Sequence, residues 1–184
     1  MSTKQYIQQF LKKQNKVGSI VPSSRFLAKK MLQNIPFDKV NVMVELGPGT
    51  GAFTPFLLDR MKPDAVLILI ELNDTFYQEL VHKIKDPRAI IVHGSATDLP
   101  ELLQSLNLEK VDCILSSLPL AIFSHELSNR ILQASKAVLH QGGHFVQFQY
   151  SLQSRKKIFR QFGNLKLSFT PLNFPPAFVY TCTK

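Results

Sequence analysis

The stretch VELGPGTGAF, residues 44–53, decides the fold of this 184-residue chain, because it joins an apolar run to a helix-like run through three glycines and a proline. Glycine lets the backbone approach a ligand closely, and the first turn of a helix offers N–H groups without partners. Glu45 lies at the end of the apolar run, and a second acid, Glu71, ends the next one. In nucleotide-binding α/β folds an acid at the second place accepts hydrogen bonds from ribose hydroxyls.

Five apolar runs predict strands, and helix-like segments separate them. Strands that alternate with helices form a parallel sheet covered on both faces. After residue 150 a helix-like segment, LQSRKKIFRQF, precedes two strands joined by PLNFPP, which predicts an antiparallel pair at one edge. The expected fold is therefore α/β and Rossmann-like, with a mostly parallel seven-stranded sheet, helices on both faces and an antiparallel edge strand. The expected strands are 41–46, 65–72, 89–94, 111–117, 143–150, 165–170 and 177–183, and the helices between the first five are 50–61, 74–85, 99–106 and 124–140.

The composition, with 45% hydrophobic and 19% charged residues, is that of one globular domain. No apolar run reaches the roughly 18 residues that span a bilayer, and the N-terminus lacks the apolar core of a signal peptide, so a cytoplasmic protein is expected. Cys113 and Cys182 each lie alone in apolar strand-like segments. They are expected to be buried thiols that form neither a disulfide nor a metal site.

Charge divides the chain into three parts. Residues 1–40 contain eight Lys or Arg residues and one acidic residue. Residues 41–150 contain eight Lys or Arg residues and twelve acidic residues, and residues 151–184 contain six Lys or Arg residues and no acidic residue. Two basic ends favour an anionic partner, either nucleic acid or a membrane surface. Solubility alone explains the charge equally well.

The loop spacing G-P-G-T-G departs from the dinucleotide fingerprint G-x-G-x-x-G, which leaves an NAD site as the alternative. The loop and its two acids resemble motif I of class I S-adenosylmethionine-dependent methyltransferases. The resemblance implies that S-adenosyl-L-methionine is the cofactor and that Glu71 binds its ribose. Relatives carry an acid where Ser95 stands, so Ser95 or Asp98 is expected to contact the adenine. The expected donor-binding residues are Ser24, Glu45, Gly47, Gly49, Thr50, Gly51, Glu71, Leu72, Ser95, Ala96 and Ser116.

The segment SSLPL, residues 116–120, follows the fourth expected strand, where the methyl acceptor of such a fold should lie. It resembles the N-P-P-Y or N-L-P-Y box of methyltransferases that act on the amino group of adenine. In that box a polar side chain and a backbone carbonyl hold the amine, and an aromatic stacks on the base. By resemblance Ser116, Ser117 and the carbonyl of Leu118 orient an amine, and Pro119 holds the turn. Leu120 replaces the aromatic, which suits a small aliphatic amine; an ordinary strand-to-loop turn is the alternative.

Residues 3–17 have an amphipathic pattern. An aromatic and apolar face flanked by lysines is typical of a helix that lies in a membrane interface, and a helix packed on the core is the alternative. Further on, Ser23 or Ser24 is expected to cap a helix that begins near Arg25, which would bring polar groups near the donor. The expected membrane-contacting residues are Tyr6, Ile7, Phe10, Leu11, Lys12 and Lys13.

Five segments together are similar to the small bacterial phospholipid N-methyltransferases, which convert phosphatidylethanolamine stepwise to phosphatidylcholine. The resemblance implies a peripheral enzyme on the inner face of the membrane, with an N-terminal amphipathic helix and helical entry segment at 1–38 and a methyltransferase domain at 39–184. A monomer is expected. Its expected substrate is phosphatidylethanolamine, and nucleic acid is not an expected partner. The segments are VGSIVPSSRFLAKKM, ELGPGTGAFT, SSLPL, GGHFVQFQYS and NFPPAFVY.

The ethanolamine nitrogen is mostly protonated at neutral pH and must lose a proton before it attacks. Tyr150 and His125 are candidates to assist, and Tyr150 is also a candidate to bind the head-group phosphate. Arg25, Arg155, Lys156 and Lys157 are candidate ligands of that phosphate. Lys156 and Lys157 are explained equally well as a solvated basic face.

Two other functions remain open. The basic ends and the amine box also fit an RNA adenine N6-methyltransferase, although the stacking aromatic is missing. A non-catalytic donor-binding protein that senses membrane charge, with a site decayed at Ser95, is the third reading.

Overall fold

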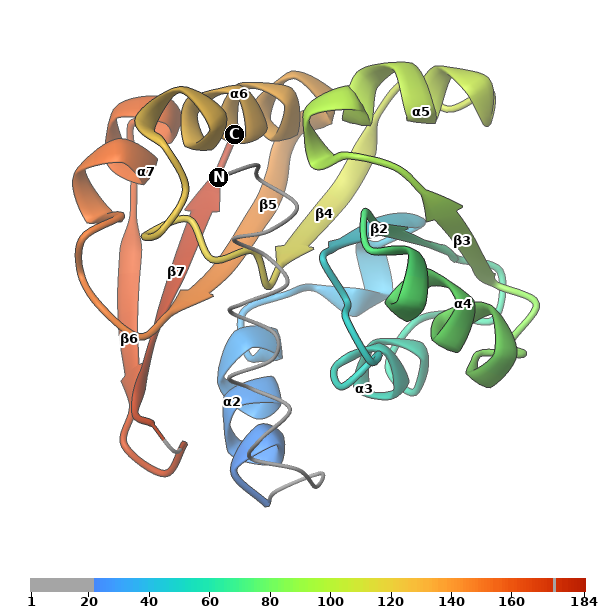
Figure 1. Ribbon diagram of the computed structural model, residues 1–184, viewed down its shortest axis with the longest axis horizontal. Coiled ribbons are helices and arrows are strands. Elements are labelled where there is room, and N and C mark those ends of the chain that lie inside the picture. Colours follow the sequence, from blue (N-terminus) through green and yellow to red (C-terminus); the bar gives the residue numbers. More distant parts are fainter. Residues whose placement is uncertain (1–21, 174) are drawn as a thin grey trace.

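The computed structural model describes residues 22–173 and 175–184. Its strands form one seven-stranded sheet in the order β3-β2-β1-β4-β5-β7-β6 (Figure 1). The first five strands pair in parallel, and β7 lies antiparallel between β5 and β6. The strands are β1 (Val42–Leu46), β2 (Val66–Glu71), β3 (Ala89–His93), β4 (Val111–Ser116), β5 (Leu139–Gln149), β6 (Lys166–Thr170) and β7 (Ala177–Thr183).

The carboxyl ends of the parallel strands meet at one edge of the sheet, here called the carboxyl edge. Gln149, at the end of β5, pairs with Phe178, near the start of β7. Thr170, at the end of β6, pairs with Ala177. The turn between β6 and β7 therefore also lies at the carboxyl edge, toward the bottom of Figure 1.

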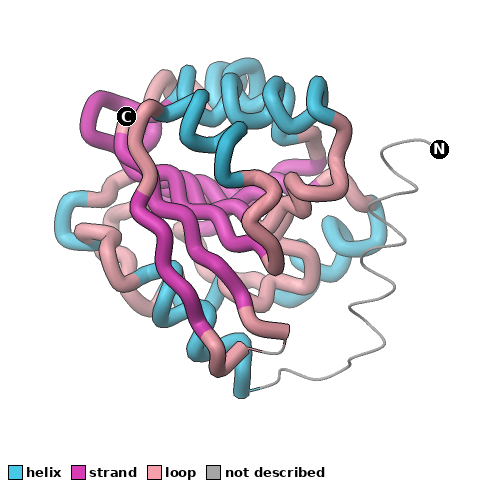
Figure 2. Tube along the Cα trace, turned by 90° about the vertical axis from the view of Figure 1, so that its left-hand side faces the viewer, coloured by secondary structure: helices cyan, strands magenta, loops and turns pink. Residues whose placement is uncertain are grey.

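Helices cover both faces of the sheet (Figure 2). One apolar cluster joins the sheet to α5, α6 and α7, and a second joins it to α2 and α3. Neighbouring strand residues alternate between the two: Val44 belongs to the first cluster and Met43 to the second. The helices are α2 (Pro22–Leu32), α3 (Thr54–Leu58), α4 (Asp74–Lys83), α5 (Leu99–Ser105), α6 (His125–Val138) and α7 (Arg155–Phe162), with 3-10 turns η1 (Phe37–Lys39) and η2 (Ala96–Asp98).

The α/β class, the parallel strands and the antiparallel edge pair are confirmed, while several boundaries differ from the prediction. The helix predicted at 50–61 is reduced to α3 (Thr54–Leu58). Its start is delayed because Gly51 has a φ of +74°, which no right-handed helix contains. The α2 helix begins at Pro22, so Ser23 and Ser24 lie in its first turn and do not precede it. Proline suits that first turn, where its missing N–H costs no hydrogen bond.

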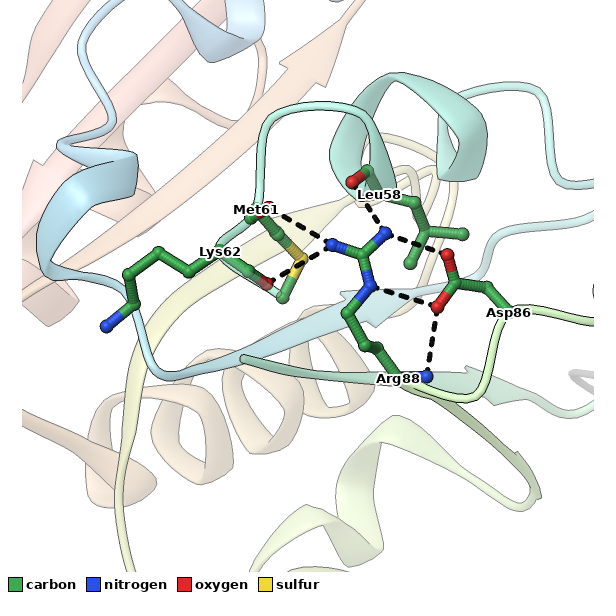
Figure 3. A network of polar contacts seen from close by, with 5 residues as sticks. All are labelled: Leu58, Met61, Lys62, Asp86 and Arg88. Atoms are coloured by element: carbon green, nitrogen blue, oxygen red, sulfur yellow. Dashed lines mark hydrogen bonds and ion pairs between the residues drawn. The ribbon is translucent and has the colours of Figure 1, made fainter. Parts of the chain in front are cut away.

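A polar clamp ends α3 and joins it to the start of β3 (Figure 3). The guanidinium of Arg88 donates to the carbonyl oxygens of Leu58, Met61 and Lys62 at 2.9–3.2 Å. It also donates to both carboxylate oxygens of Asp86, at 2.9 and 2.7 Å. A cation at carbonyls that the last helical turn leaves without partners stabilises the end of a helix, so a five-residue α3 has a fixed end.

The predicted amphipathic segment, residues 3–17, lies outside the described residues. Among the helices that are described, none is long and apolar enough to cross a membrane. Cys113 and Cys182 are buried and free, as predicted.

Candidate active site at the carboxyl edge

The donor loop turns back at Gly47, which leaves β1 with a φ of +65°. Its N–H donates to the carbonyl of Ile70 on β2 at 3.0 Å. A β-carbon at this position would lie 2.6 Å from a methyl carbon of Leu118, in the segment after β4. Only glycine allows both this backbone conformation and this close approach. The predicted donor loop and the predicted acceptor box are therefore in direct contact.

Glu71 ties the donor loop to the end of β2. Its Oε2 accepts a hydrogen bond from the N–H of Gly49 at 3.0 Å, and its Oε1 accepts one from the N–H of Asn73 at 2.8 Å. Burial raises the pKa of Glu71, and these backbone donors lower it. The N–H of Leu72 is a further backbone donor to this carboxylate. A carboxylate has about four acceptor positions, so capacity for a ribose hydroxyl remains.

Glu45 is fully buried on β1, and one of its carboxylate oxygens has no hydrogen-bond partner among the described residues. Its Oε2 accepts a hydrogen bond from the hydroxyl of Thr54 at 2.8 Å. Its Oε1 has no partner among the residues that the structure describes. Burial raises the pKa of Glu45 to about 7, against the Thr54 hydrogen bond and with a smaller contribution from Glu71. A buried carboxylate oxygen without a partner suits a cationic ligand, and S-adenosyl-L-methionine carries both a sulfonium and an ammonium group.

The predicted adenine end lies in the connection after β3. Ser95 caps η2: its hydroxyl accepts from the N–H of Thr97 at 3.2 Å and lies 2.8 Å from the Thr97 hydroxyl. That hydroxyl donates to Asp98 at 2.7 Å. Ser95 and Asp98 are thus joined through Thr97, so they belong to one hydrogen-bonded unit and are not alternatives in separate places.

The acceptor box begins where β4 ends. The hydroxyl of Ser116, which is fully buried, accepts weakly from the N–H of Leu118 at 3.4 Å. The N–H of Ser117 donates to the carbonyl of Leu46 at 3.0 Å, which extends the pairing of β4 with β1. Ser117 therefore lies beside Gly47, at the start of the donor loop. Its hydroxyl is buried and has no partner among the described residues.

The carbonyl oxygen of Leu118 is already occupied by protein donors. It accepts from the side-chain amides of Gln147 and Gln149 at 3.0 and 2.8 Å. It also accepts from the N–H of Leu120 at 2.8 Å. A carbonyl oxygen has two lone pairs, so in this arrangement it has no capacity left for an amine. Gln147 and Gln149 were not predicted; their only signal is that two polar residues at alternate positions interrupt the apolar pattern of a central strand.

Leu120, predicted to contact the substrate, is fully buried in the apolar cluster under α5, α6 and α7. Its side chain faces the core, so that prediction is wrong for this arrangement. Its carbonyl accepts from the hydroxyl of Ser128 and the ammonium of Lys157, both at 3.1 Å. Burial lowers the pKa of Lys157. This lysine therefore holds the loop and is not part of a solvated face.

The other predicted residues lie around this site. Tyr150 follows β5, and its ring contacts that of Phe148 edge to face, with 5.6 Å between the ring centroids. The ring centroid of Phe148 lies 5.8 Å from that of Phe53 in the donor loop. His125 opens α6, exposed, with its Nδ1 3.2 Å from the amide nitrogen of Asn129. Thr50 and Leu72 lie on the two donor-side loops, Ala96 begins η2, and Pro119 lies in the acceptor box. Arg25 is exposed on α2, and Arg155 is exposed at the start of α7. The side chain of Ser24 is not described.

Comparison with known proteins identifies the class of enzyme. The profile of the family "Ribosomal RNA adenine dimethylase" matches residues 2–163. The chain is 32% identical over 179 residues, 96% of its length and 93% of the relative's, to an ornithine lipid N-methyltransferase from Singulisphaera acidiphila. It is 30% identical over 140 residues to ribosomal RNA small subunit methyltransferase A from Ureaplasma parvum; the match covers 68% of this chain and 49% of that relative.

Solved structures with a similar fold include SAM-dependent methyltransferases. A SAM-dependent methyltransferase from Archaeoglobus fulgidus superposes with a TM-score of 0.68 at 15% identity, over 96% of this chain and 99% of that one. The two acids, the glycine loop between them and the amine box beside that loop thus agree with the family match. The chain belongs to the ribosomal RNA adenine dimethylase family of class I S-adenosylmethionine-dependent methyltransferases.

Proposed function

We propose that this enzyme N-methylates the amino group of phosphatidylethanolamine, stepwise toward phosphatidylcholine, as a monomer at the inner face of the membrane. The observation that carries the proposal is the hydroxyl of Ser117, which is buried, without a partner among the described residues, and beside the donor loop. The relative named as an ornithine lipid N-methyltransferase supports a lipid amine as acceptor.

The residues present fit the methyl donor, which supplies an electrophilic methyl group on a sulfonium when it is bound. The Oε1 of Glu45 offers a negative charge to a donor cation, and Glu71 offers acceptors to the ribose. Ser117 accepts one N–H of the neutral amine and so directs the nitrogen lone pair toward the methyl carbon. With the donor bound, the amine nitrogen would take its methyl group as the S–C bond breaks, the bonding electron pair would stay on sulfur, and the nitrogen would release its proton to solvent, with Tyr150 as the candidate to assist. Catalysis of this kind is largely positioning.

An aliphatic amine fits the box better than adenine does. A base extruded into a pocket is held by stacking on aromatic or apolar side chains, and Leu120 is buried in the core where the box of adenine enzymes has its aromatic.

Ribosomal RNA adenine methylation is the second candidate, favoured by the family profile and by the Ureaplasma parvum relative. The chain spans about half the length of that relative. A donor-binding protein without catalysis is the third reading, and any methyl turnover excludes it.

The test is methyl transfer from labelled S-adenosyl-L-methionine to three acceptors offered separately: vesicles with phosphatidylethanolamine, vesicles with ornithine lipid, and ribosomal RNA. Labelled N-methyl phosphatidylethanolamine is the expected product. Label in ornithine lipid alone would support a lipid amine as the acceptor but contradict phosphatidylethanolamine as the substrate. Label only in RNA adenine would overturn the proposal in favour of the second candidate.

A further inference from the structure

The fold places α2 beside strands of the basic C-terminal segment. The α2 helix packs against β5, β6 and β7, and the ammonium of Lys166, at the start of β6, lies 3.5 Å from the side-chain oxygen of Asn34, just after α2. The lower part of Figure 1 shows α2 beside the β6–β7 hairpin. Segments far apart in the sequence thus share one surface.

This surface carries no acidic side chain in the part of the chain that the structure describes. The sequence has no Asp or Glu after Glu126, and α2 has none either. The elements β5, α7, β6, β7 and α2 therefore present only basic, polar and apolar side chains. Such a surface carries a positive potential that attracts anionic partners.

The exposed apolar side chains gather on the same elements. Among the described residues nine large apolar side chains are exposed, and seven belong to these elements or to the links between them. Leu172, in the β6–β7 turn, is the most exposed of these nine at 62%. Five form what we call the apolar rim: Phe26, Tyr150, Leu152, Phe169 and Leu172.

The apolar rim lies at the carboxyl edge. Tyr150 and Leu152 follow the end of β5, and Phe169 and Leu172 lie at the end of β6 and in its turn. Asn34 is near the start of β6, at the opposite edge, so Phe26, two turns earlier on α2, lies toward the carboxyl edge. Arg25 and Lys29 are exposed on α2, and Arg155 and Lys156 are exposed at the start of α7, which covers the other face of the sheet. The acceptor box opens at this same edge.

We propose that the apolar rim and its basic neighbours dock on the surface of a bilayer that contains anionic phospholipid. The inference deepens the proposed function, on which it rests for its purpose: docking would hold the acceptor box against the head groups. Apolar side chains gain free energy when they enter the interface, and lysine and arginine are attracted to anionic lipid. RNA fits less well, because bases stack on aromatic faces and two of the five rim residues are leucines.

The chain has no tryptophan, so a single introduced tryptophan reports on its own surroundings. The test uses Leu172→Trp and, as a matched control, Val81→Trp, which replaces an exposed apolar residue of α4 outside this surface. Both full-length variants are mixed, without methyl donor, with vesicles of phosphatidylglycerol and phosphatidylcholine. Because neither lipid has a primary amine, the result does not depend on methyl transfer.

Emission from Leu172→Trp is expected to shift to shorter wavelength and to be quenched by brominated lipid, while Val81→Trp stays unchanged. Cosedimentation with vesicles is expected to weaken as salt rises. The proposal would be overturned if Leu172→Trp bound the vesicles while its introduced indole remained in water. It would also be overturned if the protein did not cosediment with the vesicles. A shift with RNA and none with vesicles would also overturn it. A failure here combined with methyl transfer to a short-chain soluble phosphatidylethanolamine would leave the proposed function intact.

Discussion

The side-chain amide of Gln149 lies 2.8 Å from the carbonyl oxygen of Leu118, across 31 positions of the sequence. Its own oxygen accepts from the N–H of Ala121 at 3.2 Å, so one glutamine on β5 holds both ends of the acceptor loop. The loop is thereby fixed by the neighbouring strand before any substrate arrives. A preorganised acceptor loop loses less entropy when it aligns a nucleophile.

Replacing Gln149 by leucine should loosen this loop. In the Gln149→Leu variant the N–H of Ala121 loses its acceptor, and kcat for methyl transfer is expected to fall by about tenfold, a barrier change of about 1.4 kcal/mol. Donor affinity, measured by calorimetry, should stay within about twofold, since no donor contact is removed. The exposed Gln153→Leu serves as the matched control; equal kcat in both variants would contradict the role given to Gln149.

Ser117→Ala removes a box hydroxyl that has no partner among the described residues, unlike that of Ser116. We expect kcat/KM for the lipid amine to drop by about tenfold, the value of one hydrogen bond, while donor binding and the melting temperature change little. Steady-state kinetics on vesicles would measure the drop. Ser105→Ala, on the surface of α5, is the control, and full activity of Ser117→Ala would remove this residue from the mechanism.

Donor binding should depend on pH through Glu45, whose pKa of about 7 lies above its ordinary value because of burial. Below that pKa the carboxyl is protonated and offers no charge to a donor cation; above it the carboxylate is present. The dissociation constant of S-adenosyl-L-methionine should therefore rise by roughly tenfold from pH 8 to pH 6. Calorimetry on Glu45→Gln should show weaker binding without this slope, whereas Glu79→Gln, an exposed acid on α4, should keep it.

Arg88→Ala should destabilise the fold without altering the site directly. The change removes the clamp after α3 and takes the Arg88 donors from the carbonyls of Leu58 and Met61, so the melting temperature should fall by about 5 °C. The guanidinium holds the pKa of Asp86 down at about 2. A lowered carboxyl pKa adds stability above its unfolded value, and this part is lost as pH falls through about 2. Thermal scans should therefore show a smaller difference in melting temperature between wild type and Arg88→Ala at pH 2 than at pH 7. The control Arg130→Ala should have the melting temperature of the wild type at both pH values.

The sequence was sufficient to locate Glu45 and Glu71, because an acid that ends an apolar run marks the carboxyl end of a buried strand. It also located the amine box next to the glycine loop, since parallel strands bring their ends to one edge. It could not identify Gln147, Gln149 and Lys157, whose contacts with the box cross 29 to 37 positions. The length of α3 was also out of reach, because glycine in a loop and glycine in a helix start look alike until φ is known.

The insertion of β7 between β5 and β6 determines the order in which parts of the sheet form while the chain is being synthesised. Chains fold from the N-terminal side as they are made, yet β6 has no neighbour to pair with in the described sheet until β7, the last of the seven strands, has been synthesised. The parallel half of the sheet, with both acids and the acceptor box, can assemble earlier. The hairpin that carries Leu172 is completed last, so a nascent chain acquires its donor loop before it acquires the apolar rim.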